Sequence, residues 1–227
     1  MTPGDQHSGA PAAQPLRSDA ERNRERIIAA ARTVFARDGL NASMASVARE
    51  AGVEIATMFR RFPTKVELVD AVFVDRMTAY ADAVTAALDP WHRFVGYVET
   101  ACAMQAADYG VADVLTTTFP SAKALEHRRN AAYEGMVELI GRAKATGRLR
   151  ADFDPSDLVL VHMANAGVVN ATGDAAPDAW RRVVALLNQS FEAPARGPLP
   201  ASHDHDALYQ AMLRPGPAGA AAPESGG

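Results

Sequence analysis

Apolar residues between positions 22 and 37 recur at the spacing of one helix face. They fall at i, i+1, i+4, i+7 and i+8, and they are Ile27, Ile28, Ala31, Val34 and Phe35. The pattern predicts an amphipathic helix over 22–37. Gly39 marks its end, because glycine adopts the left-handed conformation of a helix C-terminus without strain.

Two short helices are predicted next, separated by a tight turn. Ser43 is a favourable N-cap for a helix over 44–51, because its hydroxyl can accept a bond from a free backbone N–H. Gly52 allows the chain to turn sharply, and a second short helix is predicted over 54–59. The pair has the form of a helix-turn-helix.

Prolines divide the rest of the chain. Pro63 ends the second short helix, since it restricts the residue before it, and Thr64 can cap a long helix over 65–87. Asp89-Pro90 marks a boundary. The helices predicted beyond it are 93–107, 111–118, 121–146, 155–172, 177–190 and a weaker one at 204–213. Pro155 and Pro177 are expected in first turns, where a missing N–H costs little.

The predicted fold class is all-α, because no stretch alternates apolar and polar residues as a strand would. An N-terminal three-helix domain containing the helix-turn-helix is expected over 22–81 and a C-terminal helical domain over 82–213. The flanking segments 1–21 and 214–227 are rich in Pro, Gly and Ala and are expected to be disordered tails.

Composition excludes several classes of protein. Of 227 residues, 48% are hydrophobic and 22% charged, which is typical of a globular protein. The single cysteine, Cys102, excludes an intramolecular disulfide framework and a cysteine zinc cluster, and a reducing cytoplasm is the expected compartment. The sequence has no apolar run of membrane-spanning length and no signal-peptide pattern at its start.

Motifs of enzymes and metalloproteins are lacking as well. There is no phosphate-binding glycine loop and no nucleophile elbow, so no cofactor and no catalytic residue is predicted. The segment from His203 to Asp206 reads His-Asp-His-Asp and could suggest a metal site. No further ligand cluster accompanies it, so we interpret it as the polar start of a helix and predict no metal. Cys102 is expected to be a buried structural thiol.

Charge is distributed unevenly. Residues 17–65 contain ten Lys or Arg and six Asp or Glu, whereas residues 66–227 contain thirteen and twenty. A basic N-terminal part on an acidic remainder suggests that one end meets a polyanion. The helix-turn-helix lies in the basic part, and such a pair can place its second helix in a DNA major groove. Thr57 lies on that helix, and the cations Arg60, Arg61 and Lys65 follow where phosphates would run.

The ordered pattern of this region resembles the DNA-binding domain of TetR-type transcriptional regulators. The resemblance covers about Arg22 to Tyr80. It rests on Arg26 to Ala31, Val34-Phe35, Gly39, Val47-Ala48, Ala51-Gly52-Val53, Thr57 to Phe62 and Lys65 to Leu68. In isolation, an Arg-Arg pair or a glycine between helices is more often structural. The complete pattern favours binding to double-stranded operator DNA.

The resemblance implies DNA contacts at eight positions. They are Ser43, Ala45, Glu54, Thr57, Phe59, Arg60, Arg61 and Lys65. Ser43 would cap its helix and bond a phosphate, Ala45 offers a methyl group to thymine, and Thr57 is expected to contact a base.

Three of these positions depart from the usual family residues. Phe59 replaces a common tyrosine and lacks its hydroxyl, while Arg61 replaces a common histidine and offers a charge-assisted bond instead. Glu54 replaces a common serine; its charge suits the helix dipole, and it repels phosphate unless it accepts from a cytosine amino group.

For the helical remainder the resemblance implies a ligand-binding and dimerisation domain. The helices at 155–172 and 177–190 would pair with their copies in a homodimer, and the alternative is that both pack inside one subunit. The residues predicted for the dimer interface are Ala164, Gly167, Ala171, Trp180, Val183, Val184 and Leu187. A two-fold protein would match a two-fold operator.

An effector site is predicted among the same helices. The candidate ligand-binding residues are Met104, Tyr109, Phe119, Met136, His162, Met163, Asn165 and Ala166. Methionines suit an adaptable pocket, and His162 or Asn165 would be its polar anchor. The alternative is ordinary core packing with His162 and Asn165 as satisfied buried polar groups.

The sequence therefore predicts a cytoplasmic, homodimeric, TetR-type repressor that a small hydrophobic ligand releases from its operator. One alternative is a constitutive DNA-binding regulator without an effector, which a cavity-free body would favour. Another is an all-helical enzyme, which a set of buried groups with strongly shifted pKa values would favour.

Overall fold

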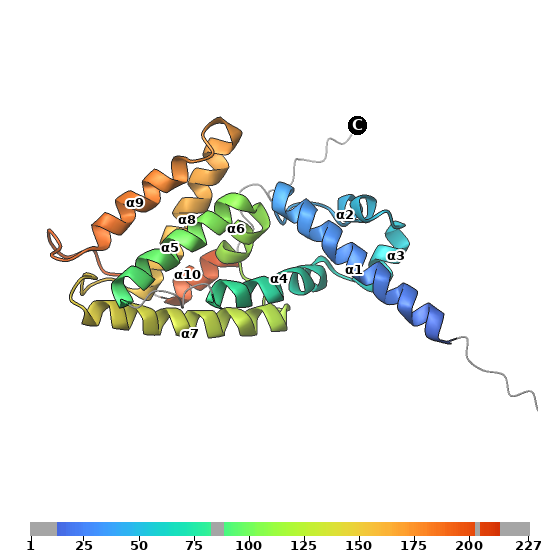
Figure 1. Ribbon diagram of the computed structural model, residues 1–227, viewed down its shortest axis with the longest axis horizontal. Coiled ribbons are helices and arrows are strands. Elements are labelled where there is room, and N and C mark those ends of the chain that lie inside the picture. The colour runs from blue at the N-terminus through green and yellow to red at the C-terminus, as the bar shows by residue number, and fades with distance from the viewer. Residues whose placement is uncertain (1–12, 83–88, 203–204, 214–227) are drawn as a thin grey trace, which may run out of the picture.

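The computed structural model describes residues 13–82, 89–202 and 205–213, and within them it is all-α, as predicted. The helices are α1 (Ala13–Asp38), α2 (Met44–Ala51), α3 (Ile55–Arg61), α4 (Lys65–Asp82), α5 (Pro90–Ala107), α6 (Tyr109–Thr116), α7 (Lys123–Ala145), α8 (Pro155–Thr172), the short 3-10 helix η1 (Gly173–Ala175), α9 (Ala179–Phe191) and α10 (His205–Met212). Figure 1 shows α1–α3 at one end, which we call the head, and α5–α10 at the other, which we call the body. Helix α4 runs from one to the other.

Most helix starts follow local signals that the sequence displays. The bounds predicted for α2 and α8 agree with the structure. Pro155 occupies the first turn of α8, where Asp154 accepts from the Ser156 N–H at 2.9 Å and Asp157 accepts from the Asp154 N–H at 2.8 Å. Each carboxylate satisfies a backbone donor that the helix leaves open, which fixes where α8 begins.

Seven helix starts differ from the prediction: those of α3, α5, α6, α7, α9 and α10 by one to three residues, and that of α1 by more. Helix α1 begins at Ala13, so it includes residues that we expected in the N-terminal tail. Pro15 falls in its first turn, where proline is tolerated, and the residues after it are mostly good helix formers. Pro177 lies before α9, which begins at Ala179, and is not in its first turn. The tail residues 1–12 and 214–227 lie outside the described residues.

The head has a closed apolar core made by α1, α2, α3 and the first part of α4. Its largest fully buried side chains include Ile27, Phe35, Met58, Leu68 and Phe73. Because α1 contacts α2, α4 and α6, this core continues toward the body. The orientation of the helix-turn-helix therefore depends on α1 and α4 together.

Two side-chain carboxylates connect the head and α4 to the body by accepting hydrogen bonds from backbone N–H groups. Asp113 of α6 accepts from the Leu40 N–H at 2.6 Å, just after Gly39, whose φ is +67°. A Cβ at Gly39 would lie 2.7 Å from the same carboxylate, so the two groups are in close contact. Asp70 of α4 accepts from the Leu125 N–H at 2.7 Å, at the start of α7.

The body core is aromatic. The Phe94 ring packs edge-on against Phe153, with 5.3 Å between centroids, and Phe153 packs likewise against Phe191 at 4.9 Å. These rings come from α5, the α7–α8 loop and α9, so they hold three segments distant in sequence together. Within the described ranges, no helix is both long and apolar enough to cross a membrane.

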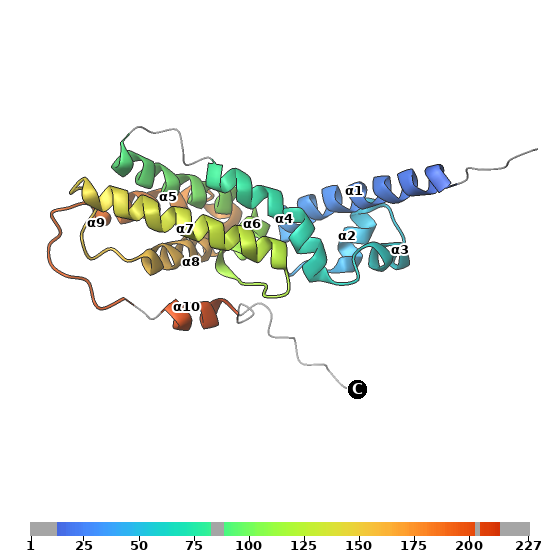
Figure 2. The same cartoon turned by 90° about the horizontal axis from the view of Figure 1, so that it is seen from below.

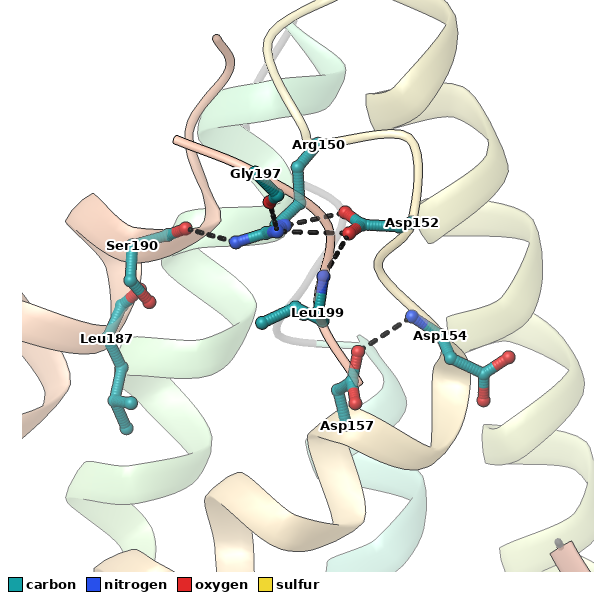
Figure 3. Close-up of polar contacts among 8 residues, drawn as sticks. All are labelled: Arg150, Asp152, Asp154, Asp157, Leu187, Ser190, Gly197 and Leu199. Atoms are coloured by element: carbon teal, nitrogen blue, oxygen red, sulfur yellow. Dashed lines mark hydrogen bonds and ion pairs between the residues drawn. The ribbon is translucent and has the colours of Figure 1, made fainter. Parts of the chain in front are cut away.

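The segment after α9 is fastened back onto the α7–α8 loop. The guanidinium of buried Arg150 makes two bonds to Asp152, at 2.6 and 3.0 Å, and donates to the carbonyls of Ser190 and Gly197 (Figure 3). Asp152 in turn accepts from the Leu199 N–H at 2.9 Å. This network directs the chain toward α10, which lies beside α8 on the outside of the body (Figure 2).

Candidate nucleic-acid interface and cavity

Helix α2 is set by its N-cap and by three buried residues. The Ser43 hydroxyl accepts from the Ser46 N–H at 3.0 Å, so the predicted cap is present. Val47, Ala48 and Ala51 are buried in the head core. Ser43 and Ala45 remain exposed at the start of the helix.

An arginine from α1 fixes the turn between α2 and α3. Gly52 adopts φ +62° and ψ +39°, the left-handed conformation expected there. Arg26 donates to the carbonyls of Ala51 at 2.7 Å and Gly52 at 3.2 Å. The guanidinium thus satisfies carbonyl groups that the end of α2 leaves open. This bond could not be predicted from the sequence, because Arg26 lies 25 residues before Ala51.

Helix α3 combines a buried anchor with an exposed outer face. Met58 is fully buried, whereas Ile55 and Phe59 are 44% and 47% exposed. The Thr57 hydroxyl accepts from Arg60 at 3.0 Å, and Glu54 precedes the helix without a capping bond from its side chain. The helix therefore presents apolar groups in the middle of its outer face and arginines at its end.

The cations at the end of α3 and the start of α4 differ in their surroundings. Arg60 and Arg61 are exposed, whereas Lys65 is partly buried at the start of α4. Burial lowers the pKa of Lys65, and the carboxylate of Asp113 partly opposes this shift. Lys65 therefore lies at the boundary of the head and the body. Thr64 caps α4 as predicted, because its hydroxyl accepts from the Glu67 N–H at 3.2 Å.

The structure thus places all eight predicted DNA-contact residues on one helix-turn-helix and the start of α4. Six are exposed: Ser43, Ala45, Glu54, Phe59, Arg60 and Arg61. Thr57 and Lys65 are partly buried. Since a helix is exposed here beside several exposed cations, the head can meet a grooved, anionic partner.

The body contains a cavity of about 160 Å³ between α5, α6, α7, α8 and α10. Its lining is mostly apolar and includes three tyrosines, Tyr97, Tyr133 and Tyr209. Met136 and His162, both predicted for an effector site, also line it. Burial lowers the pKa of His162 to about 4, so this imidazole is neutral at pH 7.

The other six predicted effector residues are not in the cavity lining, and this part of the prediction is wrong for the cavity observed. They are Met104, Tyr109, Phe119, Met163, Asn165 and Ala166. Asn165 instead ties α8 to α5, since its amide donates to the Cys102 carbonyl at 3.2 Å and to Gln105 at 3.0 Å. Asn165 is therefore a buried group of the α5–α8 contact, with its amide N–H groups bonded and its Oδ1 without a partner among the described residues.

A charged pair that the sequence analysis missed borders the cavity. Arg129 of α7 donates to the carbonyls of Val114 and Thr117, both at 2.7 Å, and its Nε lies 3.6 Å from Glu126. Burial lowers the pKa of Arg129, and Glu126 opposes this shift. In the sequence, a Glu and an Arg three residues apart are typical of an exposed helix pair, so nothing indicated their inward position.

The predicted dimer residues divide into two groups. Trp180 and Val184 are buried in the core of the single chain, so they do not belong to a surface that a second copy could reach; this is a correction of the prediction. They sit one helical turn apart on the α9 face that packs on α5 and α8. Ala164, Gly167 and Ala171 are exposed on α8, and Val183 and Leu187 are partly buried on α9.

Two further expectations concern Cys102 and metals. Cys102 is fully buried, as predicted, and burial raises the pKa of its thiol to about 12. In the part of the chain that the structure describes, no group of three or more His, Cys, Asp or Glu side chains could hold a metal ion. His203 and Asp204 lie outside that part, and α10 begins at His205.

Two family models match this chain over most of its length. The model described as bacterial regulatory proteins of the tetR family matches residues 27–72, which contain the helix-turn-helix. The model described as the C-terminal domain of SbtR-like transcriptional regulators matches residues 89–189. The chain belongs to the TetR family. It is a DNA-binding transcriptional regulator, and members of this family are generally not enzymes.

The chain is also similar to solved structures. A TetR transcription regulatory protein from Mycobacterium vanbaalenii is 30% identical, over 79% of this chain and 100% of that chain, with a TM-score of 0.47. FadR of Bacillus halodurans, a fatty acid degradation regulator, is 20% identical over 77% of this chain and 96% of that chain, with a TM-score of 0.57. FadR of Bacillus subtilis, solved in complex with stearoyl-CoA, is 13% identical over 74% of this chain and 97% of that chain, with a TM-score of 0.55. The two FadR proteins show likeness of fold alone. No curated protein matches the chain significantly.

Proposed function

We propose that this TetR-family protein is a homodimeric repressor that acts in the cytoplasm and leaves its operator when a small, mostly apolar molecule binds the body. The observation that carries the proposal is the continuous path from the cavity to the helix-turn-helix. Helix α7 lines the cavity and contacts α4, and in its first turn the Leu125 N–H donates to the Asp70 carboxylate of α4. A ligand that shifts α7 can therefore move α4 and the head.

The outer face of α8 supports a dimer. Leu160, Ala164, Gly167 and Ala171 are exposed at i, i+4, i+7 and i+11, which is one stripe of a helix. A Cβ at Gly167 would have no neighbour within 4 Å in the single chain, so this stripe is open to close approach by another helix. On α9, Leu186 is 55% exposed and would be covered in the same interface.

The effector class follows from the size and lining of the cavity. An engineered protein cavity of roughly 150 Å³ holds benzene, so about 160 Å³ suits one ring with a few further atoms. Three tyrosines and neutral His162 favour an aromatic or alicyclic molecule with one polar group. The Bacillus subtilis FadR binds stearoyl-CoA, whose acyl chain is far longer than a single ring, so we propose a different ligand for this protein.

The cavity also separates this proposal from its alternatives. A constitutive DNA-binding regulator would have no use for a mostly apolar pocket in its body. An enzyme would need an acid or base poised near neutral pH, whereas His162, with a pKa of about 4, is neutral and buried. We therefore propose binding rather than catalysis in the body.

The test begins with selection of genomic DNA fragments on the purified full-length protein, followed by operator binding against a library of single-ring compounds. We expect an inverted repeat and at least one compound that weakens operator binding. Ala132→Phe fills the cavity from α7 and should abolish the response while sparing operator affinity. Ala131→Phe, on the adjacent exposed position, is the matched control and should keep the response. Failure to select any fragment would refute operator binding, and an unresponsive wild type would refute the switch.

The dimer has its own test. Gly167→Leu should block the close approach of α8 and give a monomer in sedimentation or light scattering. Gly135→Leu is the matched control, because Gly135 is also exposed on a helix with no atom within 4 Å of its Cβ position. A wild-type monomer at micromolar concentration would refute the dimer.

A further inference from the structure

The recognition helix α3 exposes an apolar patch where a DNA-reading helix would meet base edges. Ile55 and Phe59 lie at i and i+4, so they are neighbours on one face, and they are 44% and 47% exposed. Ala56 beside them is exposed as well. Met58, in contrast, is fully buried, so the helix has placed one apolar residue inside and kept the others on its surface.

Hydrogen-bonding groups are sparse in the middle of this face. Thr57 is partly buried, and its hydroxyl accepts a bond from Arg60 at 3.0 Å. Glu54 is an acceptor with a charge that phosphates repel. The patch is therefore suited to apolar contact more than to hydrogen-bond readout of bases.

The surrounding charge identifies the partner as DNA and not an apolar protein surface. Arg60 and Arg61 follow the patch on the same helix and are exposed, and Arg49 is exposed at the end of α2. Cations beside a convex helix suit the phosphates that flank a major groove. Within that groove, thymine alone among the four bases presents a C5-methyl group, which is the natural partner of an apolar side chain.

We infer that Ile55 and Phe59 read thymine C5-methyl groups in each half of the operator, and that these contacts set much of the sequence preference. The inference rests on the proposed operator binding and extends it to the chemistry of the site that is read. It assigns to Phe59 a base contact in place of the phosphate contact that its missing hydroxyl cannot make.

Thymine-to-uracil replacement tests this directly, because it removes the methyl group and leaves the hydrogen-bonding edge unchanged. With the full-length protein and its selected operator, each thymine is replaced in turn and affinity is measured by fluorescence anisotropy. Burying one carbon is worth roughly 0.8 kcal/mol. We therefore expect operator affinity to fall about fourfold when one contacted thymine is replaced, and about fifteenfold when the same thymine is replaced in both halves.

Protein variants identify the side chains responsible. Ile55→Ala and Phe59→Ala should each weaken operator binding and remove the difference between thymine and uracil at its own position. Arg60→Ala should weaken binding to both operators equally and keep their ratio. Val137→Ala removes an apolar side chain that is 40% exposed on α7 and should change neither value.

The outcomes separate the inference from the proposal beneath it. If the protein binds its operator but every uracil replacement is neutral, or if both variants keep the thymine-to-uracil ratio, the inference is overturned and operator binding stands. If no DNA is selected even at low salt, both are overturned.

Discussion

The head and the body of this protein reach function by opposite constructions. The head presents its site on the exposed face of a helix-turn-helix. Three of its bonds join residues three apart, namely Ser43 with Ser46, Arg60 with Thr57 and Thr64 with Glu67, and Arg26 of α1 adds a bond from farther along the chain. The body forms its site between helices, and side chains from Tyr97 to Met212 line one pocket. A site built mainly from local bonds is encoded largely in a short stretch of sequence, whereas a pocket lined by several helices depends on how those helices pack.

The two regions also treat buried polar groups differently. The head core is apolar throughout its described buried side chains. The body buries Gln105, His162 and Asn165 between α5 and α8, with Gln105 donating to the His162 carbonyl at 3.2 Å. Substitutions of single groups in the two regions test this difference.

Acid should weaken the body through His162. Its pKa falls from 6.5 to about 4 on folding, so the unfolded chain binds the proton more readily. The stability that neutral His162 provides is complete above about pH 6.5 and is lost as the pH falls toward 4, by roughly 3 kcal/mol in total. Urea unfolding across this range measures it.

His162→Gln provides the control for acid. The difference between the wild-type and variant pH curves isolates the imidazole, because the carboxyl of Asp113, whose pKa burial raises, is present in both. Parallel curves for the two proteins between pH 6.5 and 4.5 would contradict the assignment.

A methyl group at the junction of head and body should be nearly as damaging. Gly39→Ala imposes a left-handed conformation on alanine and pushes the new Cβ against Asp113, with a loss of roughly 2 to 3 kcal/mol in thermal or urea unfolding. Gly147→Ala imposes the same type of conformation, at φ +74°, with no atom within 4 Å, and should cost about 1 kcal/mol. Equal losses would show that the contact with Asp113 contributes nothing.

Removing the guanidinium of Arg26 should loosen the helix-turn-helix with a smaller loss of stability. Arg26→Met keeps an apolar side chain but removes the hydrogen bonds to the carbonyls of Ala51 and Gly52. We expect the free energy of unfolding to fall by about 1 to 2 kcal/mol. Operator affinity should fall too, because the angle between α2 and α3 is less fixed. Arg32→Met, exposed on the same helix, should change neither stability nor operator binding.

The smallest expected effect is at the N-cap of α2. Ser43→Ala should cost about 1 kcal/mol, and Ser43→Asp should restore it, because a carboxylate also caps a helix. Asp at this position repels phosphate, so operator binding should stay weak although stability recovers. Full recovery of both in Ser43→Asp would show that Ser43 acts only as a cap.

The sequence predicts the head better than the body. The bounds of α2 and the caps Ser43 and Thr64 were predictable, since each depends on residues a few positions apart. Met136 and His162 line the cavity, whereas Met163, adjacent to His162, does not, and residue type alone could not distinguish the two positions. Which side of α8 faces inward is set by its packing against α5, α6 and α9, and the periodicity of an almost wholly apolar helix carries no record of that direction.

The contact between Gly39 and Asp113 has a consequence for building chimeric sensors from this protein. A head taken at the α4 boundary would carry Gly39 and Leu40 away from the α6 carboxylate of Asp113, which accepts from the Leu40 N–H at 2.6 Å and leaves no room for a Cβ at Gly39. A recipient body with a longer side chain at the position of Asp113 would collide with the graft, and one with a small apolar residue would leave the Leu40 N–H without its acceptor. Exchange of heads between relatives therefore calls for transfer of the glycine and the aspartate together, even though α4 alone connects the two parts along the chain.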